Sequence, residues 1–96
     1  MHIAEFQALI RRLYLEKDSR RGAEATLLWL VEEVGELLEA HRKQSRDGIE
    51  EEIADVIAWV TSYANLAGID VEEALKKKYP GRCRYCNSMP CTCEKG

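Results

Sequence analysis

Apolar residues recur three or four positions apart along most of the chain, which is the spacing of one face of an α-helix. Three long stretches show this pattern: 2–17, Ala23–Arg42 and Ile49–Ala67. Gly68 follows the third stretch, in the position where a glycine often ends a helix. A fourth, shorter helix is predicted to open with Asp70 as its cap and to end before Pro80. The pattern therefore predicts an all-α fold of four helices.

The apolar stripes of the two central helices are expected to form the core. Their members are Leu27, Leu30, Val31, Val34 and Leu38 in one helix and Ile53, Ile57, Val60 and Ala64 in the next. The segment Asp18–Gly22 breaks the periodicity, and Asp18 or Ser19 is expected to cap the helix that follows. A chain of 96 residues buries a limited core, so association with further copies would add stability.

Composition narrows the functional classes. Charged residues make up 32% of the chain, and no apolar run approaches the ~20 residues of a membrane span. The N-terminus lacks the architecture of a signal peptide, so we expect a cytoplasmic protein with no membrane partner. The net charge of −3 is uneven, with ten acidic residues between Ala23 and Asp55 and a basic excess from Lys76 onward. An acidic centre beside a basic end suits a metal-bound polyphosphate and argues against nucleic acid as the partner of the acidic helices.

Two acidic pairs stand out at helical spacing. Glu33 and Glu36 lie three positions apart in the second helix, and Glu52 and Asp55 lie three apart in the third. Residues at this spacing share a helix face. The predicted connection, roughly Lys43 to Gly48, is short enough to make the two helices antiparallel neighbours. The two pairs are therefore expected to approach each other.

Four neighbouring carboxylates must take up protons or bind a cation. Like charges ~4 Å apart repel by ~4 kcal/mol at an effective dielectric constant of ~20. Carboxylate oxygens favour a hard cation, so Mg²⁺ or Mn²⁺ is the expected ligand. The competing interpretation is that these acids form an ordinary solvated helix face. From spacing alone both interpretations stay open.

The ordered motifs Glu32-Glu33-Val-Gly-Glu36 and Glu52-Ile-Ala-Asp55 resemble the signature of the MazG-like, all-α nucleoside triphosphate pyrophosphohydrolases. The resemblance covers about residues 1–80. It implies Mg²⁺-dependent cleavage between the α and β phosphates, giving a nucleoside monophosphate and pyrophosphate. It also implies a homo-dimer or tetramer. Glu33, Glu36, Glu52 and Asp55 would hold the metal, and Glu32 is the candidate for orienting or deprotonating the attacking water or for holding a second ion.

Candidate substrate contacts lie around these motifs. The resemblance implies that Trp59, one turn after Asp55, contacts the nucleobase. The alternative is that Trp59 only packs in the core. Trp29 is a second candidate for base contact. Arg20 and Arg21 are candidates to bind phosphate oxygens, which a guanidinium matches in geometry, but ordinary surface charge is the favoured interpretation from the sequence. The resemblance also implies a phosphate-binding lysine after the second motif, and Lys76, Lys77 and Lys78 compete for that role.

All four cysteines lie in the last segment of the chain. They form two close pairs, Cys83 with Cys86 and Cys91 with Cys93. In a cytoplasmic protein such pairs indicate metal rather than disulfides, and four thiolates suit tetrahedral Zn²⁺. A redox pair, an iron–sulfur ligand set and an unstructured tail are the alternatives.

The sequence thus predicts a MazG-like catalytic domain over residues 1–80 and a zinc knuckle over residues 81–96. The alternative function is a zinc-stapled helical module that binds a nucleotide or a protein without turnover. A further alternative is a protein that binds nucleic acid through its basic cysteine tail, which would give strongly salt-dependent binding.

Overall fold

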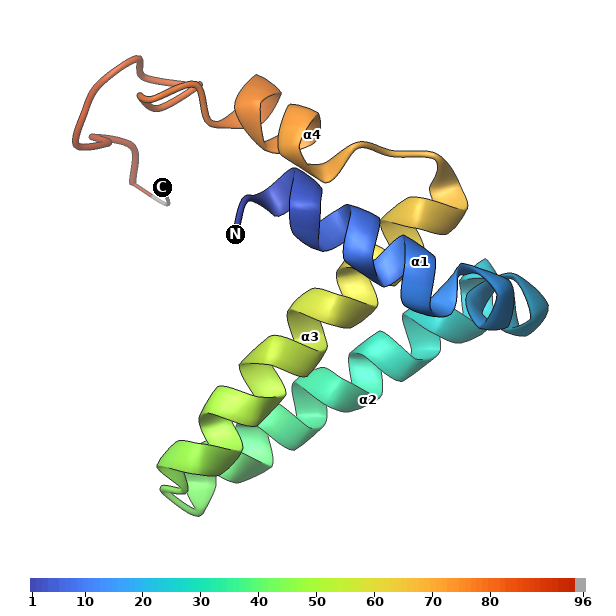
Figure 1. Cartoon of the computed structure of the whole chain (residues 1–96). Coiled ribbons are helices and arrows are strands. Elements are labelled where there is room, and N and C mark those ends of the chain that lie inside the picture. Colours follow the sequence, from blue (N-terminus) through green and yellow to red (C-terminus); the bar gives the residue numbers. More distant parts are fainter. Residues whose placement is uncertain (95–96) are drawn as a thin grey trace.

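Four helices make up the fold. The computed structural model describes residues 1–94, and these contain four α-helices and no strand. The elements are α1 (Ile3–Arg21), α2 (Ala23–Arg42), α3 (Arg46–Ala67) and α4 (Val71–Lys78) (Figure 1). The all-α prediction is therefore confirmed, and the second helix has the predicted bounds.

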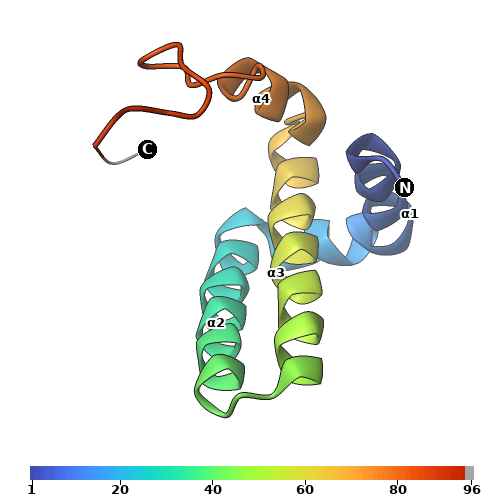
Figure 2. The same ribbon diagram turned by 90° about the vertical axis from the view of Figure 1, so that its left-hand side faces the viewer.

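The helices α2 and α3 form an antiparallel hairpin that is the centre of the fold. They run side by side over most of their length (Figure 2) and make the most extensive contact between any two elements. The hairpin turns at Lys43–Ser45, which is shorter than predicted, because α3 already begins at Arg46. The Ser45 hydroxyl caps α3 by accepting a hydrogen bond of 3.1 Å from the Gly48 amide. The tight turn fixes the register that brings Glu33 and Glu36 close to Glu52.

The first helix is longer than the sequence pattern indicated. The predicted break over Asp18–Gly22 is wrong, since α1 continues to Arg21 and only Gly22 separates it from α2. Arg21 donates a hydrogen bond of 2.7 Å to Asp18 one turn earlier, which supports the last turn of the helix. Gly22 has φ of +94°, a conformation that glycine adopts without strain. This corner lets α1 cross the upper part of the hairpin, where it packs mainly on α3.

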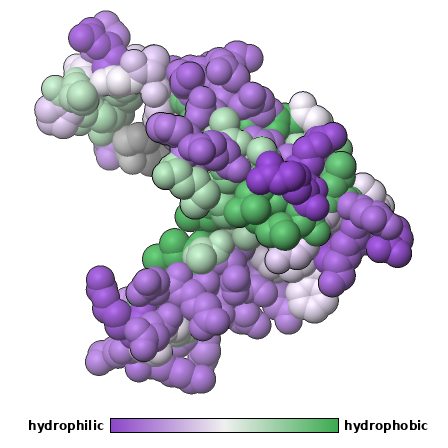
Figure 3. Space-filling view, in the orientation of Figure 1, coloured by the Kyte–Doolittle hydropathy of each residue, from purple (hydrophilic) through white to green (hydrophobic). Residues whose placement is uncertain are grey.

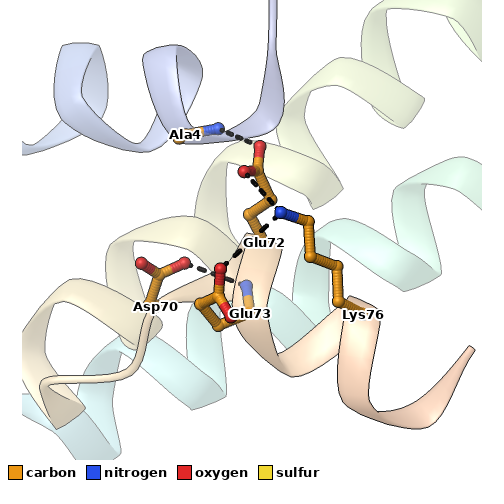
Figure 4. Close-up of polar contacts among 5 residues, drawn as sticks. All are labelled: Ala4, Asp70, Glu72, Glu73 and Lys76. Atoms are coloured by element: carbon orange, nitrogen blue, oxygen red, sulfur yellow. Dashed lines mark hydrogen bonds and ion pairs between the residues drawn. The ribbon is translucent and has the colours of Figure 1, made fainter. Parts of the chain in front are cut away.

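The short helix α4 packs against the N-terminal part of α1. Gly68 ends α3 in the left-handed conformation, with φ of +69°, and the Asp70 carboxylate caps α4 by accepting from the Glu73 amide, as predicted. The Gln7 side chain joins α1 to this region, with bonds to the Asn65 side chain and to the Ile69 carbonyl. Glu72 accepts from the Ala4 amide at 3.4 Å (Figure 4). The contact thus places α4 at the end of α1 that is remote from Arg21.

Much of the predicted core is exposed in the single chain. The stripe of α2 formed by Leu27, Val31, Val34 and Leu38 and the stripe of α3 formed by Ile53, Ile57 and Val60 are all exposed, and Val31 reaches 69%. The predicted burial is therefore wrong for one chain, although Ala64 is buried as expected. The two helices meet instead through other faces, which carry Leu37, Val56 and Trp59 as partly buried residues. Apolar atoms also gather over the middle of the surface shown in Figure 3.

The segment after α4 contains no helix or strand as far as residue 94. It turns back on itself through backbone hydrogen bonds from Cys83 to Ser88 and from Asn87 to Cys83. The last two residues of the predicted knuckle, 95–96, lie outside the described residues. Within the described chain, every helix is too short or too polar to cross a membrane.

Candidate active site

Three of the predicted metal ligands meet on the hairpin. Glu33 and Glu36 project from one face of α2, and Glu52 projects from the first half of α3. One carboxylate oxygen from each lies within 4.8 Å of the other two. The i, i+3 spacing on α2 and the antiparallel register of α3 account for this convergence. Such a group of oxygens can coordinate a divalent cation.

The environment of the three acids supports cation binding better than a solvated face. Glu33 Oε2 and Glu52 Oε2 are buried, and within the described chain neither has a hydrogen-bond partner. Burial of Glu33, the neighbouring Glu52 carboxyl group and the charges of Glu36 and Asp55 raise the pKa of Glu33 from 4.5 to about 7. Buried carboxylate oxygens without donors are costly unless a proton or a cation neutralises them. The donor set therefore fits Mg²⁺ or Mn²⁺.

The remaining acids of the two motifs lie at the edge of this group. Asp55 is exposed and does not belong to the set of three within 4.8 Å, although its charge is close enough to raise the pKa of Glu33. Glu32 is exposed on α2 and also lies outside the set. The close group therefore has three members, with Asp55 nearby.

Both tryptophans lie together beside the acids. The rings of Trp29 and Trp59 stack with centroids 6.1 Å apart and planes inclined by 19°. The guanidinium carbon of Arg21 lies 4.7 Å from the centroid of Trp59, a distance typical of a cation–π contact. The structure thus gathers Trp29, Trp59 and Arg21, three of the predicted substrate contacts, at one end of the hairpin.

A cavity of about 250 Å³ opens between α1 and α3 at this place. Its lining includes Tyr14, Lys17, Asp18 and Arg21 from α1 and Asp55, Trp59 and Ser62 from α3. Asp55 connects the cavity to the acidic group, and Trp59 supplies a flat aromatic wall. The arrangement provides an aromatic surface, cations and acceptors beside a candidate metal site.

The other predicted phosphate ligands lie away from the acids or are engaged elsewhere. Arg20 is exposed and pairs with Glu16 at 3.7 Å. Lys76 pairs with Glu72 and Glu73 on α4 (Figure 4), and Lys78 lies 5.7 Å from the centroid of the Tyr79 ring. The 19 residues of α1 span about 28 Å at 1.5 Å per residue, and α4 packs at the end remote from Arg21. Within one chain, the lysines of α4 are therefore not part of this site.

Apart from Arg21, sequence reasoning missed the α1 residues that line the cavity. Asp18 was expected to be a helix cap, but it is only 2% exposed and lies beneath Arg21 on the cavity wall. A signal was present in the sequence, because Asp18 follows Phe6, Ile10 and Tyr14 at intervals of four. An acid that continues an apolar helix stripe is expected to have a specific partner.

The four cysteines form a second candidate metal site in the tail. Their sulfur atoms all lie within 4.8 Å of one another, and none is in a disulfide. Cys83 Sγ lies 3.8 Å from Cys93 Sγ, and Cys86 Sγ lies 3.9 Å from Cys91 Sγ. A tetrahedral zinc site with Zn–S bonds of ~2.3 Å requires separations of about 3.8 Å. The sulfur geometry therefore fits Zn²⁺.

Backbone amides also point at two of these sulfurs. The Thr92 amide lies 3.3 Å from Cys86 Sγ, and the Cys93 amide lies 3.2 Å from Cys91 Sγ. Hydrogen bonds from Thr92 lower the pKa of the Cys86 thiol to about 5. Thiolate is the form that binds metal, so these amides favour the state that a metal needs. Side-chain hydrogen bonds with Cys91, Cys86 and Cys83 favour the protonated thiol of Cys93 and raise its pKa to about 12.

Comparison with known proteins agrees with the geometry of the hairpin. The model of the MazG nucleotide pyrophosphohydrolase domain matches residues 21–87, which include both acidic motifs. A dATP/dGTP diphosphohydrolase of Cyanophage S-2L is 38% identical over 78 residues, which cover 79% of this chain and 69% of that relative. Residues 21–87, which the family model matches, contain the acidic group on the hairpin and the stacked tryptophans. The chain therefore belongs to the MazG family of nucleotide pyrophosphohydrolases and is a hydrolase of that class.

Proposed function

We propose that the protein hydrolyses nucleoside triphosphates between the α and β phosphates, giving a nucleoside monophosphate and pyrophosphate, and that it requires Mg²⁺ or Mn²⁺. The pair of buried carboxylate oxygens without hydrogen-bond partners, Glu33 Oε2 and Glu52 Oε2, carries the proposal. Glu36 completes the close group, and Asp55 is the fourth ligand at its edge. When bound, a divalent cation neutralises charge on the phosphate oxygens and lowers the pKa of a coordinated water.

The protein's own residues then bind and orient the substrate. Trp59 offers its ring to the nucleobase, and Trp29 supports that ring by stacking against it. Arg21 lines the cavity, where it also pairs with Asp18, and we assign it to phosphate oxygens in preference to Arg20, which does not line the cavity. We assign Glu32 to orienting or deprotonating the attacking water, or to holding a second ion. Full kcat in Glu32→Gln at saturating Mg²⁺ would remove Glu32 from the mechanism.

Purine deoxynucleoside triphosphates are the first substrates to examine. The cyanophage relative is named a dATP/dGTP diphosphohydrolase. The cavity beside Trp59 has a volume of about 250 Å³, close to the ~300 Å³ at which small-molecule sites begin, so it suits a planar base better than a whole nucleotide. We place the triphosphate outside this cavity, toward Asp55 and the acidic group.

A homo-oligomer is part of the proposal. A folded monomer of 11.0 kDa exposes about 5,600 Å², whereas this chain exposes 7555 Å², about 1,900 Å² more. The excess is apolar in part, because Val31, Leu38 and Ile57 remain exposed on the hairpin. An excess this large exceeds the ~800 Å² that each partner buries in a standard interface. A second copy of the hairpin, with matching apolar stripes, is the occupant that such a surface fits.

The same assembly offers a role for the α4 lysines. Lys76 and Lys78 lie too far from the acids of their own chain to meet the same substrate. A neighbouring copy would have to bring them to the site if either lysine binds phosphate. We therefore propose that these lysines bind phosphate only in an oligomer.

We also propose that the tail holds one structural Zn²⁺ through Cys83, Cys86, Cys91 and Cys93. The support is the sulfur spacing of 3.8 and 3.9 Å and the two amides that point at sulfur. No other hydrogen bond or helix holds residues 89–94 in place within the described chain, so a metal would supply most of the order there.

The test is pyrophosphate release from a panel of ribo- and deoxynucleoside triphosphates, with and without Mg²⁺. Glu36→Gln and Asp55→Asn are expected to lower kcat by at least a hundredfold, because each removes a ligand charge. Glu39→Gln is the matched control, since Glu39 is exposed on the same helix, lies outside the acidic group and pairs with Lys43. Release of inorganic phosphate without pyrophosphate would contradict the proposed cleavage site, and activity that survives both ligand variants would contradict the metal assignment.

A further inference from the structure

Asp18 is a buried acid that the proposed reaction does not yet use. It lies on the last turn of α1 and is only 2% exposed. Its Oδ1 accepts a hydrogen bond of 2.7 Å from Arg21, but within residues 1–94 its Oδ2 has no partner. A buried carboxylate oxygen without a donor loses its hydration and gains nothing in return. Residues 1–94 therefore maintain a buried acceptor to which none of them donates.

A purely structural role for Asp18 explains only half of this arrangement. Arg21 holds the end of α1 through Asp18 Oδ1, and a guanidinium can satisfy both oxygens of a carboxylate through two parallel bonds. Here Arg21 reaches one oxygen only, while its guanidinium carbon lies over the ring of Trp59. The orientation of Arg21 over the tryptophan thus leaves Asp18 Oδ2 available to another donor.

The position of Asp18 identifies the kind of donor. Asp18 lines the cavity of about 250 Å³ that has Trp59 as its aromatic wall and Asp55 at the side of the acidic group. A nucleotide whose phosphates lie near the acids would direct its base toward Trp59. The groups on a base that donate to a carboxylate oxygen are ring N–H and exocyclic amino groups.

We propose that Asp18 Oδ2 accepts a hydrogen bond from the exocyclic amino group of the substrate base, so that Asp18 determines specificity. This inference rests on the proposed function, because it assumes that the base occupies the cavity beside Trp59. If Asp18 has this role, the preferred substrates are nucleotides whose base carries an amino group. A base with a carbonyl oxygen in that place would bring one acceptor against another. The hydrogen bond to Asp18 Oδ2 would then not form.

Paired substrates that differ by one amino group give the sharpest test. dGTP and dITP differ only by the 2-amino group of guanine. At C4 of the base, dCTP carries an amino group and dUTP carries a keto group. We expect the parent protein to favour the amino member of at least one pair by tenfold or more in kcat/KM. Sites built around a buried polar partner reject analogues that lack it more strongly than apolar pockets reject a changed methylene. A parent protein that treats both pairs alike within twofold would overturn the inference.

Asp18→Asn tests the residue itself. Asparagine keeps the shape and can keep the acceptor for Arg21, but it presents an amide N–H in place of the free oxygen. The preference for the amino member is expected to fall to within about threefold or to invert, with kcat/KM for the keto member unchanged or higher. An equal loss on both members of a pair would show that Asp18 acts only by supporting Arg21 and would overturn the inference. Asp47→Asn, at an exposed position near the start of α3, is the matched control.

Binding without turnover separates this inference from the proposed reaction. The same base pairs are compared as α,β-methylene analogues by isothermal titration calorimetry in Mg²⁺, with circular dichroism confirming that the variant is folded. A preference in binding that Asp18→Asn abolishes would support the role of Asp18 even if no triphosphate were hydrolysed. Hydrolysis of the panel with no base preference in either rate or binding would overturn the role of Asp18 and leave the proposed reaction intact.

Discussion

Trp59 stacks on Trp29 across the hairpin, with ring centroids 6.1 Å apart, and the pair joins the two helices that carry the acidic motifs. Trp29 lies one turn before Glu33 on α2, and Trp59 lies one turn after Asp55 on α3. The same contact therefore supports the register of the acids and provides the aromatic wall of the cavity. Because the two tryptophans have different roles, a mutation at each should change a different property of the protein.

Replacing each tryptophan is expected to affect different quantities. Trp59→Ala removes the surface on which the base stacks, and stacking contributes ~1–3 kcal/mol per base, so KM should rise about tenfold or more. Trp29→Ala mainly removes the aromatic contact, worth about 0.5–1.5 kcal/mol, and should lower the unfolding free energy with a smaller change in KM. Steady-state kinetics and urea unfolding measure the two quantities. Equal changes of KM in both variants would contradict the division of roles, and Trp59→Phe should retain most of the affinity.

The protonation of Glu33 predicts how stability depends on pH when no metal is bound. Its pKa is about 7 in the folded chain against 4.5 ordinarily, so between these values the folded state binds more protons than the unfolded state. The contribution of Glu33 to the unfolding free energy is therefore full below about pH 4.5 and is lost as the pH rises through about 7. Urea unfolding in chelator between pH 5 and 8 should show this loss in the parent protein and not in Glu33→Gln.

Metal binding should show the opposite dependence on pH. A carboxylate must be deprotonated to coordinate a cation, so the affinity for Mg²⁺ is expected to increase as the pH rises through about 7. Calorimetric titration with Mg²⁺ at pH 6 and pH 8 measures the effect. Glu39→Gln should behave like the parent protein in both experiments. An affinity for Mg²⁺ that does not change with pH would remove Glu33 from the ligand set.

The helices were predictable because apolar spacing and caps are local properties. Asp70 and Gly68 carry such signals, and both act at the predicted ends of α4 and α3. The close approach of Glu33, Glu36 and Glu52 also followed from spacing plus a short turn. The role of Asp18 did not, because the partner of a buried acid depends on how α1 crosses α3, which no local pattern encodes. The exposure of Val31 was missed for a related reason, since periodicity identifies an apolar face but not the element that covers it.

Metal in the cysteine tail should be measurable independently of catalysis. We expect one Zn²⁺ per chain, released when the thiols are modified, because Cys83, Cys86, Cys91 and Cys93 are free and close together. Cys83→Ser should lose the bound zinc, and substitution by Co²⁺ should give the absorption of a tetrahedral thiolate site in the parent protein only. Ser88→Ala keeps all four sulfurs and should keep the metal. Two disulfides in place of bound metal in the purified protein would exclude the zinc site.

The exposed apolar stripe of α2 predicts that a single charge will dissociate the assembly. Val31 is 69% exposed in the isolated chain, and a second copy would cover it in the proposed interface. Val31→Glu would then place a charge against apolar side chains, and an unpaired buried charge costs several kcal/mol, so the variant should be monomeric where the parent is a dimer or tetramer. Sedimentation velocity across a concentration series measures this. Gln44→Glu adds the same charge in the exposed turn of the hairpin and should leave the mass unchanged. A parent protein that sediments as a monomer at high concentration would contradict the proposed interface, because the stripe would then stay exposed, and the α4 lysines would have no route to the site.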